Sequence, residues 1–290
     1  MKLNLRTLVE AKTESRPLAW LTCYDYSFAR VLSETDLDLI LVGDSGGMVA
    51  LGYGDTVPVT MDEMIMMTAA VRRGAPNKFI VGDMPKGSYE VNNDDAVMNA
   101  MRFAKEAGVD AVKLEGGTSM DDRIAAITKS GIPVFGHIGL TPQSAVARGG
   151  YRVVGRESEE GQRIMEDASA VQEAGAVAVL LEALPPALSK SITVRLQIPV
   201  LGIGAGPHVD GQLLILHDLL GLYPDFRPSF AQCFIPDVID TFEKSLAASG
   251  VEARTERRDG LRELSRLAVE AFIKATRDGS FPGAKYSYSD

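Results

Sequence analysis

The sequence predicts an α/β fold in which a single domain, residues 1–290, forms a (β/α)8 barrel (a TIM barrel) with an N-terminal capping helix and extra C-terminal helices. About eight short apolar runs alternate with amphipathic stretches, and several runs are apolar at consecutive positions, as in parallel strands covered on both faces. A chain of 290 residues that is 46% hydrophobic can bury so large a core. An open, doubly wound sheet is the alternative. It is disfavoured because no GxGxxG motif follows the first run and the pattern does not change midway.

The apolar runs and the stretches between them define the repeat. The predicted strands are 18–24, 37–44, 79–85, 111–117, 133–140, 176–184, 199–206 and, with the weakest pattern, 211–218. Helical periodicity covers 61–74, 92–108, 121–131 and 157–175, and each of these stretches ends on glycine, the usual helix stop. Gly108, Gly131 and Gly175 lie just before the next run, which is the short link of a repeating helix–strand unit.

Both ends of the chain add helices to this repeat. Residues 1–17 are predicted to form a short helix that covers the bottom of the barrel. Residues 230–290 are predicted to form a helical extension. Within it, we expect AASGVEARTERRDG (247–260) to be a charged, mobile joint between two helical stretches.

Composition excludes several classes of protein. No apolar stretch approaches the roughly 20 residues of a membrane-spanning helix, and the N-terminus lacks the apolar region of a signal peptide. Cys23 and Cys233 form neither a disulfide framework nor a CxxC metal pair, which favours a reducing cytoplasm. The net charge of −9 argues against nucleic-acid binding. With only three histidines, a carboxylate-bound cation such as Mg²⁺ is favoured over a multi-histidine zinc site.

Charged residues recur where the predicted strands end. In order, these are Asp44 with Ser45, Asp83, Lys113 with Glu115, His137 and Glu182. The carboxyl ends of barrel strands meet at one mouth, where active sites of this fold are built. A lone acid at a strand end is usually solvated or locally paired, but charged ends on five successive strands indicate a site. Gly46 and Gly47 follow Ser45, and we expect their small size to keep the approach to the site clear.

Three of these features have two interpretations. Lys113 and Glu115 lie two residues apart and therefore point to the same face, either as site residues or as a buried pair that only satisfies itself. His137 is either catalytic or a supporting residue of the second shell. The glycines of LGIGAG (201–206) either cradle a phosphate or give clearance to a ligand or to backbone. We expect His217, at the end of the last predicted strand, to be structural.

The motifs together resemble the ketopantoate hydroxymethyltransferase family. The resemblance runs from TCYDYSFA (22–29) to LHDLLG (216–221), and it is most specific in GHIGLTPQS (136–144) combined with GGYRVVGR (149–156). It implies a (β/α)8 enzyme of pantothenate biosynthesis, commonly a homodecamer, that is cytoplasmic and binds neither nucleic acid nor membrane. The implied reaction moves a one-carbon unit from 5,10-methylenetetrahydrofolate to 3-methyl-2-oxobutanoate through a Mg²⁺-stabilised enolate and gives 2-dehydropantoate.

The resemblance also implies roles for individual residues. Asp44 and Asp83 resemble Mg²⁺ ligands, with one ion per subunit, and Glu115 resembles the acid that supports the metal. Ser45 and Lys113, together with the two aspartates, resemble the residues that hold the oxoacid. Glu182 matches the proton acceptor. These roles are chemically coherent, because a metal and a lysine stabilise negative charge where it develops on an enolate.

The chain departs from the family pattern at Met66 and Met67, at Lys86, and in the tail FPGAKYSY (281–288). Lys86 is either a cation at the barrel mouth or a solvated loop residue. Two alternatives for the activity are the same chemistry on a different 2-oxoacid and a carbon–carbon lyase of the phosphoenolpyruvate mutase and isocitrate lyase group. Such lyases carry a reactive cysteine in a KxCGH-like loop, and neither cysteine of this chain lies in one. A catalytically silent barrel that serves as an assembly or binding protein is the third alternative.

Overall fold

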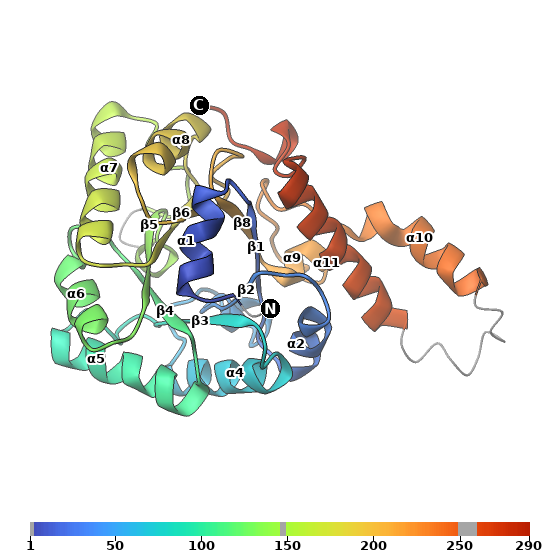
Figure 1. The fold of residues 1–290 in the computed structure, drawn as a ribbon, viewed down its shortest axis with the longest axis horizontal. Helices are drawn as coiled ribbons and strands as arrows, with labels where there is room; N and C mark the ends of the chain where they lie inside the picture. Colours follow the sequence, from blue (N-terminus) through green and yellow to red (C-terminus); the bar gives the residue numbers. More distant parts are fainter. Residues whose placement is uncertain (1–2, 146–148, 249–259) are drawn as a thin grey trace.

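The computed structural model describes residues 3–145, 149–248 and 260–290, and it contains a closed barrel of eight parallel strands in the order β1 to β8 (Figure 1). The barrel closes where β1 pairs in parallel with β8. Every strand lies within one of the predicted runs: β1 Leu18–Thr22, β2 Leu39–Val42, β3 Phe79–Asp83, β4 Ala111–Glu115, β5 Val134–Gly139, β6 Ala178–Glu182, β7 Val200–Ile203 and β8 Gly211–Leu214. The predicted fold class is therefore confirmed.

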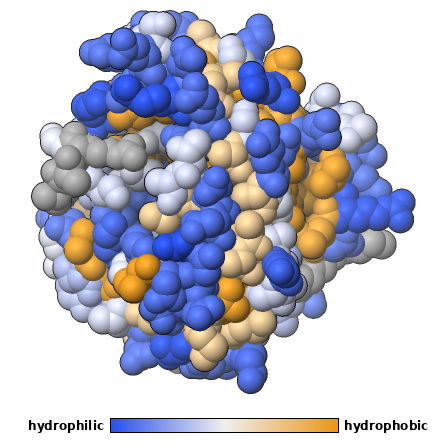
Figure 2. Space-filling view, turned by 90° about the vertical axis from the view of Figure 1, so that its left-hand side faces the viewer, coloured by the Kyte–Doolittle hydropathy of each residue, from blue (hydrophilic) through white to orange (hydrophobic). Residues whose placement is uncertain are grey.

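Helices follow most strands and surround the barrel. They are α2 Tyr26–Ser33, α3 Gly46–Val49, α4 Met61–Gly74, α5 Asn93–Arg102, α6 Asp121–Lys129, α7 Ser158–Glu173 and α8 Pro186–Arg195. A π-helical turn, Phe103–Ala107, extends α5, and a short 3-10 turn, Pro142–Ser144, follows β5. The face in Figure 2, which is the left-hand side of Figure 1, is largely hydrophilic with narrower apolar areas. This is expected of helices whose apolar sides cover a sheet.

The repeat changes at its last unit. The link from β7 to β8, residues 204–210, contains no helix. The last predicted strand, 211–218, is only half correct, because the chain leaves the sheet after Leu214 and begins the short helix α9, Leu216–Leu220. His217 therefore lies on a helix and not at a strand end. A continuous apolar run does not distinguish a buried strand from a buried helix, which accounts for the difference.

The ends of the chain occupy the predicted places. Helix α1, Leu5–Thr13, lies across the amino-terminal ends of the strands (Figure 1), where Lys12 forms an ion pair of 2.7 Å with Asp210, just before β8. Helices α10, Ile235–Ala248, and α11, Gly260–Asp278, form the C-terminal extension, and α11 packs against β1, α2 and α9. The predicted charged joint, 247–260, falls mainly outside the described residues. Among those described, no helix combines the length and hydrophobicity needed to cross a membrane.

An aromatic layer fills the barrel beneath its mouth. The rings of Trp20 and Phe135 have centroids 5.5 Å apart, and the ring of Phe79 lies 6.2 Å from that of Phe135. Phe135 is paired in register with Lys113, and His137 with Glu115. Side chains two residues apart share a face of the sheet, so on β5 the lumen changes from aromatic at Phe135 to ionisable at His137 in one step.

Candidate active site

The candidate active site is a pocket of about 1090 Å³ at the carboxyl ends of the strands. It contains every residue that the sequence predicted for the site: Asp44, Ser45, Asp83, Lys113, Glu115, His137 and Glu182. These residues belong to five successive strands, β2 to β6, or to the turn directly after β2. The structure thus brings together all seven.

The turn after β2 depends on close packing. A Cβ atom on Gly46 would lie 2.6 Å from the ring of Tyr24, and one on Gly47 would lie 2.3 Å from Val59. The expectation that these glycines keep the approach clear is therefore wrong, because the space beside them is filled by neighbouring side chains. Their lack of Cβ lets the turn pack down, and Ser45 Oγ then lies 2.9 Å from the hydroxyl of Tyr24.

A buried ion pair connects β3 and β4. Lys113 Nζ lies 2.7 Å from Asp83 Oδ1, and the two side chains are 3% and 2% exposed. Asp83 Oδ2 accepts a hydrogen bond of 3.0 Å from the backbone N–H of Asp44. Register explains the pair, because Asp83 and Lys113 are direct partners across the two strands. One aspartate thus anchors both the lysine and the turn that carries Asp44.

His137 lies between an acid and the lysine. Its Nε2 is 3.2 Å from Glu182 Oε2, and its Nδ1 is 3.3 Å from Lys113 Nζ and 3.5 Å from Glu115 Oε1. Burial and the charge of Lys113 lower the pKa of His137, which favours the neutral ring. A neutral ring that accepts from Lys113 through Nδ1 carries its proton on Nε2, facing Glu182.

Gln143, which sequence reasoning did not single out, links several of these groups. Its Nε2 donates to Asp44 Oδ2 at 2.9 Å and to the carbonyl of Met84 at 3.0 Å, and its backbone N–H donates to Glu115 Oε2 at 3.1 Å. Its Oε1 accepts a 2.6 Å hydrogen bond from the hydroxyl of Tyr89. The sequence feature that could have identified Gln143 is its position in the motif GHIGLTPQS, just beyond the end of β5.

The buried charges do not balance. Three carboxylates, Asp44, Asp83 and Glu115, share the single lysine. Burial raises the pKa of Asp44 and raises that of Asp83 well above its usual value, although Lys113 opposes both shifts. For Lys113, burial favours the neutral amine, but Asp83, Glu115 and Asp44 outweigh it and raise the pKa. A bound cation would offset the cost of burying these carboxylates and favour their ionised forms.

The donor set fits a hard divalent cation. Asp44 and Asp83 supply carboxylate oxygens on neighbouring strands, and Mg²⁺ commonly takes one or two carboxylates and completes its octahedron with water and substrate. No group of three or more His, Cys, Asp or Glu within the described ranges is arranged to hold a metal by itself. Asp44 and Asp83 are thus the residues of this pocket suited to a Mg²⁺ ion that keeps most of its water.

The glycines of LGIGAG give clearance to side chains. The position of a Cβ on Gly204 lies 2.6 Å from the ring of Phe230, and that on Gly206 lies 2.8 Å from Pro186. Both glycines also have positive φ, which an L side chain would strain. This packing explains the motif without a phosphate.

Three further residues lie apart from the ionisable cluster: Cys23, His217 and Lys86. Burial raises the pKa of the Cys23 thiol to about 12, which leaves it unreactive. The ring of His217 packs against Tyr24 and Phe28. Lys86 pairs with Glu90 at 3.0 Å and does not line the pocket.

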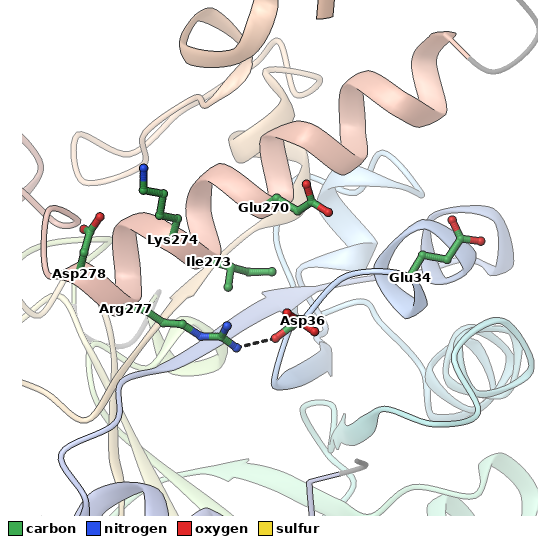
Figure 3. Close-up of a pocket in the computed structure, with 7 residues that line it drawn as sticks. All are labelled: Glu34, Asp36, Glu270, Ile273, Lys274, Arg277 and Asp278. Atoms are coloured by element: carbon green, nitrogen blue, oxygen red, sulfur yellow. Dashed lines mark hydrogen bonds between the residues drawn. The ribbon is translucent and has the colours of Figure 1, made fainter. Parts of the chain in front are cut away.

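A second concave region, the α2–α11 groove, has a volume of about 500 Å³ (Figure 3). It is lined by Glu34, Asp36, Glu270, Ile273, Lys274, Arg277 and Asp278. Arg277 points to the backbone carbonyl of Asp36, at 2.7 Å, as Figure 3 shows. Glu34 pairs with Arg262, and Glu270 with Arg266. These exposed, locally paired charges are typical of a surface between packed helices.

Comparison with known proteins places the chain among close relatives. The family model described as "Ketopantoate hydroxymethyltransferase" matches residues 2–256. A 3-methyl-2-oxobutanoate hydroxymethyltransferase from Heliobacterium modesticaldum is 45% identical over 287 residues, which is 99% of this chain and 95% of that protein. One from Alkaliphilus metalliredigens is 51% identical over 229 residues, 79% of this chain and 81% of that protein.

Solved structures share the fold at low identity. A phosphonopyruvate hydrolase in complex with oxalate and Mg²⁺ superposes with a TM-score of 0.60 at 14% identity, covering 90% of this chain and 95% of that chain. At that identity the likeness shows the barrel and nothing about the reaction.

Proposed function

This chain belongs to the ketopantoate hydroxymethyltransferase family, and from that premise we propose that it transfers a hydroxymethyl group from 5,10-methylenetetrahydrofolate to 3-methyl-2-oxobutanoate. The product is 2-dehydropantoate, an intermediate on the way to pantothenate. The names of the curated relatives support the acceptor, and their identity of 41–51% supports the same enzyme class for this chain.

One observation carries the proposal: Glu182 and Lys113 contact opposite nitrogens of the same imidazole. His137 Nε2 lies 3.2 Å from Glu182, and Nδ1 lies 3.3 Å from the lysine. The Nε2 side of the ring orients the Glu182 carboxylate, which we assign as the base. The ring therefore fixes a base and a cation at a set separation, which is what the formation of an enolate beside a carboxylate requires.

The chain's own residues divide the work. Ser45 and Lys113 bind the carboxylate and keto oxygens of the acceptor and orient its C3–H bond toward Glu182. Glu182 takes the C3 proton, and the charge that develops on the keto oxygen lies near Lys113. His137 holds the Glu182 carboxylate in place. Glu115 and Gln143 keep Asp44 and Lys113 in position.

The reaction balances with one water molecule. The C3–H bond of the acceptor breaks, and C3 forms a bond to the methylene carbon of the folate. Both bonds that join that carbon to folate nitrogens, N5 and N10, break, and water supplies the hydroxyl group. The proton from C3 and one proton from water end on these two nitrogens, so tetrahydrofolate leaves with no net release of protons.

A Mg²⁺ ion held by Asp44 and Asp83 would supply Lewis acidity next to the keto oxygen. We expect Asp83→Asn to weaken binding of Mn²⁺, used as a spectroscopic substitute for Mg²⁺, because an amide is a poor ligand for a hard cation. Electron paramagnetic resonance of free Mn²⁺ measures this. Exposed Asp62→Asn is the matched control, and equal affinity in the two variants contradicts the assignment.

The proposal is tested by separating proton removal from carbon transfer. The wild-type protein should exchange the C3 proton of 3-methyl-2-oxobutanoate for deuterium in D₂O without folate, measured by proton NMR. With folate it should form 2-dehydropantoate, measured by mass spectrometry. Glu182→Gln keeps the shape of the side chain but cannot accept the proton, so exchange should fall at least about 100-fold.

Glu166→Gln is the matched control, because it makes the same change on the exposed face of α7. It should exchange like the wild type. Exchange by Glu182→Gln at the wild-type rate would show that another group is the base. Assembly as a decamer and a cytoplasmic location stay predictions; light scattering of the purified protein tests the first.

A further inference from the structure

The pocket has an inner and an outer half that differ in chemistry. The inner half holds the buried ionisable residues at the strand ends. The outer half is formed by loops and carries Tyr151, Tyr223, Phe226, Arg227, Phe230 and Tyr288. At about 1090 Å³ the whole pocket is at the upper end of the volumes that hold drug-sized ligands. A small branched oxoacid at the inner end leaves most of that space to a larger molecule.

One wall of the outer half is rigid. The ring of Phe230 lies against Gly204, where a Cβ would be 2.6 Å away, and it meets the ring of Tyr288 edge to face at a centroid distance of 6.0 Å. The C-terminal tail that carries Tyr288 is held in turn, because Ala187 N–H donates to Asp290 Oδ1 at 2.8 Å. A wall that is already packed costs little to order when a ligand binds.

Two other aromatic side chains of the outer half are exposed. Tyr151 is 53% exposed and Phe226 is 60% exposed, yet both line the pocket. Burial and the charges of Asp55 and Glu182 raise the pKa of the Tyr151 hydroxyl, which is consistent with its place beside the inner acids. Exposed rings in a concave site offer faces on which a flat ligand can stack.

The outer half also contains a cation without a partner of its own. Arg152 pairs with Glu160 at 2.7 Å, but within the described part of the chain Arg227 forms no ion pair. The pocket lining also carries the acids Asp218 and Asp225. Burial raises the pKa of Asp218 to about 6, and the charge of Arg227 opposes that shift from a distance. A guanidinium in this position can take a carboxylate in a bidentate pair.

Glu182 lies at the boundary of the two halves. Its side chain is 15% exposed, compared with 2% for His137 and 3% for Lys113. A carbon atom from which Glu182 removes a proton would therefore face the outer half, where a second reactant has room.

We infer that the outer half is the donor subsite, in which the pterin and aminobenzoyl rings of the folate stack on Phe226 and Tyr151 against the Phe230–Tyr288 wall, and Arg227 binds the glutamate tail. This inference rests on the proposed function, since it needs a folate donor. It adds the residues that recognise the donor and a reason for the size of the pocket.

The test compares two ligands in two proteins. Calorimetry gives the affinity for tetrahydrofolate and for tetrahydropteroate, which lacks the glutamate, in wild type and in Arg227→Met. Loss of the glutamate should weaken binding to wild type about tenfold, as expected for hydrogen bonds to a charged group, and should change binding to Arg227→Met by less than twofold. Arg6→Met makes the same charge change on α1, at the opposite end of the barrel, and should behave like wild type.

The aromatic part is tested with Phe226→Ala, which should raise KM for the folate about fivefold. Tyr26→Ala is the control, because Tyr26 is also exposed (51%) but lies outside the pocket. C3 exchange without folate should be normal in Arg227→Met and Phe226→Ala. Equal loss of affinity in wild type and Arg227→Met on removing the glutamate, or an unchanged KM in Phe226→Ala, overturns the donor subsite. Absence of exchange in wild type would instead refute the proposed function.

Discussion

The barrel pocket and the α2–α11 groove are both concave and both lined by acids and bases, but their charges are arranged in opposite ways. In the pocket, Lys113 is 3% exposed and is shared by three carboxylates. In the groove, Arg277 is 37% exposed, and Glu34 and Glu270 pair with Arg262 and Arg266 at the surface. Charge and concavity alone therefore do not identify a site. The distinguishing feature is that buried ionisable groups share partners, because desolvation makes each of them depend on the others.

The largest expected difference between the two regions comes from removing a lysine. Lys113→Met leaves three buried carboxylates without their cation, so we expect a loss of about 3–5 kcal/mol of stability and no turnover. Lys274→Met in the groove should change stability by less than about 1 kcal/mol and keep full activity. Urea unfolding and product formation measure both. Similar losses in the two variants would remove the distinction between the regions.

A smaller loss of stability is expected on replacing Gln143, the shared hydrogen-bond partner of several site residues. Gln143→Met removes donors to Asp44 and Met84 and an acceptor for Tyr89, so stability should fall by about 2 kcal/mol. Tyr89→Phe should cost about 1 kcal/mol more in wild type than in Gln143→Met, where it removes only the 3.3 Å hydrogen bond from the Glu115 N–H. This double-mutant cycle is measured by urea unfolding. Additive losses would mean that the two residues do not act through their 2.6 Å hydrogen bond.

The pH dependence of stability sharpens the comparison further. Burial raises the pKa of Asp218 to about 6 in the folded protein, because the charged carboxylate is disfavoured there. The free energy of unfolding therefore falls as the pH rises from the pKa of Asp218 in the unfolded chain to about 6. Asp218→Asn removes that loss. The free energy of unfolding of Asp218→Asn, relative to that of wild type, should therefore increase by about 1 kcal/mol between pH 5 and pH 7.

Asp278 in the groove is the counterpart. Hydrogen bonds from Ser280 lower its pKa, so Asp278→Asn should reduce stability slightly at neutral pH and should lose that effect in acid. Unfolding at several pH values compares the two variants. The same pH trend in both would contradict the opposite environments that the structure gives them.

The smallest effect is expected from Arg277→Met. Its guanidinium binds the Asp36 carbonyl at 2.7 Å and lies 3.6 Å from Asp38, but it is well exposed. We expect a stability change below about 1 kcal/mol that disappears at high salt, with unchanged KM values. A change in turnover would show that the groove communicates with the barrel.

Much of the fold and the inner site could be predicted, for a physical reason. A parallel strand covered on both faces is apolar along its length, and a charge at its end stands out. Lys113 and Glu115 could be placed on one face because strand geometry alternates strictly. The closure of the barrel then followed from the number of strands.

The other features of the site could not be predicted, because they depend on contacts between residues far apart in the sequence, which a local sequence pattern does not show. Gln143 lies in a turn, and its role arises from partners on three other segments. Arg227 and Tyr288 enter the pocket from chain regions beyond the barrel strands. The roles expected of Gly46 and Gly47 were wrong for the same reason, since Tyr24 and Val59 reach them only in the folded chain.

The aromatic layer beneath the site gives the protein a built-in optical reporter. Trp20 is the single tryptophan of the chain, it is fully buried, and its ring meets Phe135 on a different part of the barrel. Its indole N–H has no hydrogen-bond partner among the described residues, so its surroundings are apolar. Native fluorescence emission should therefore be strongly blue-shifted, and it reports the packing of the Trp20 ring against Phe135 inside the barrel. Stopped-flow emission would time the formation of this layer with no label attached.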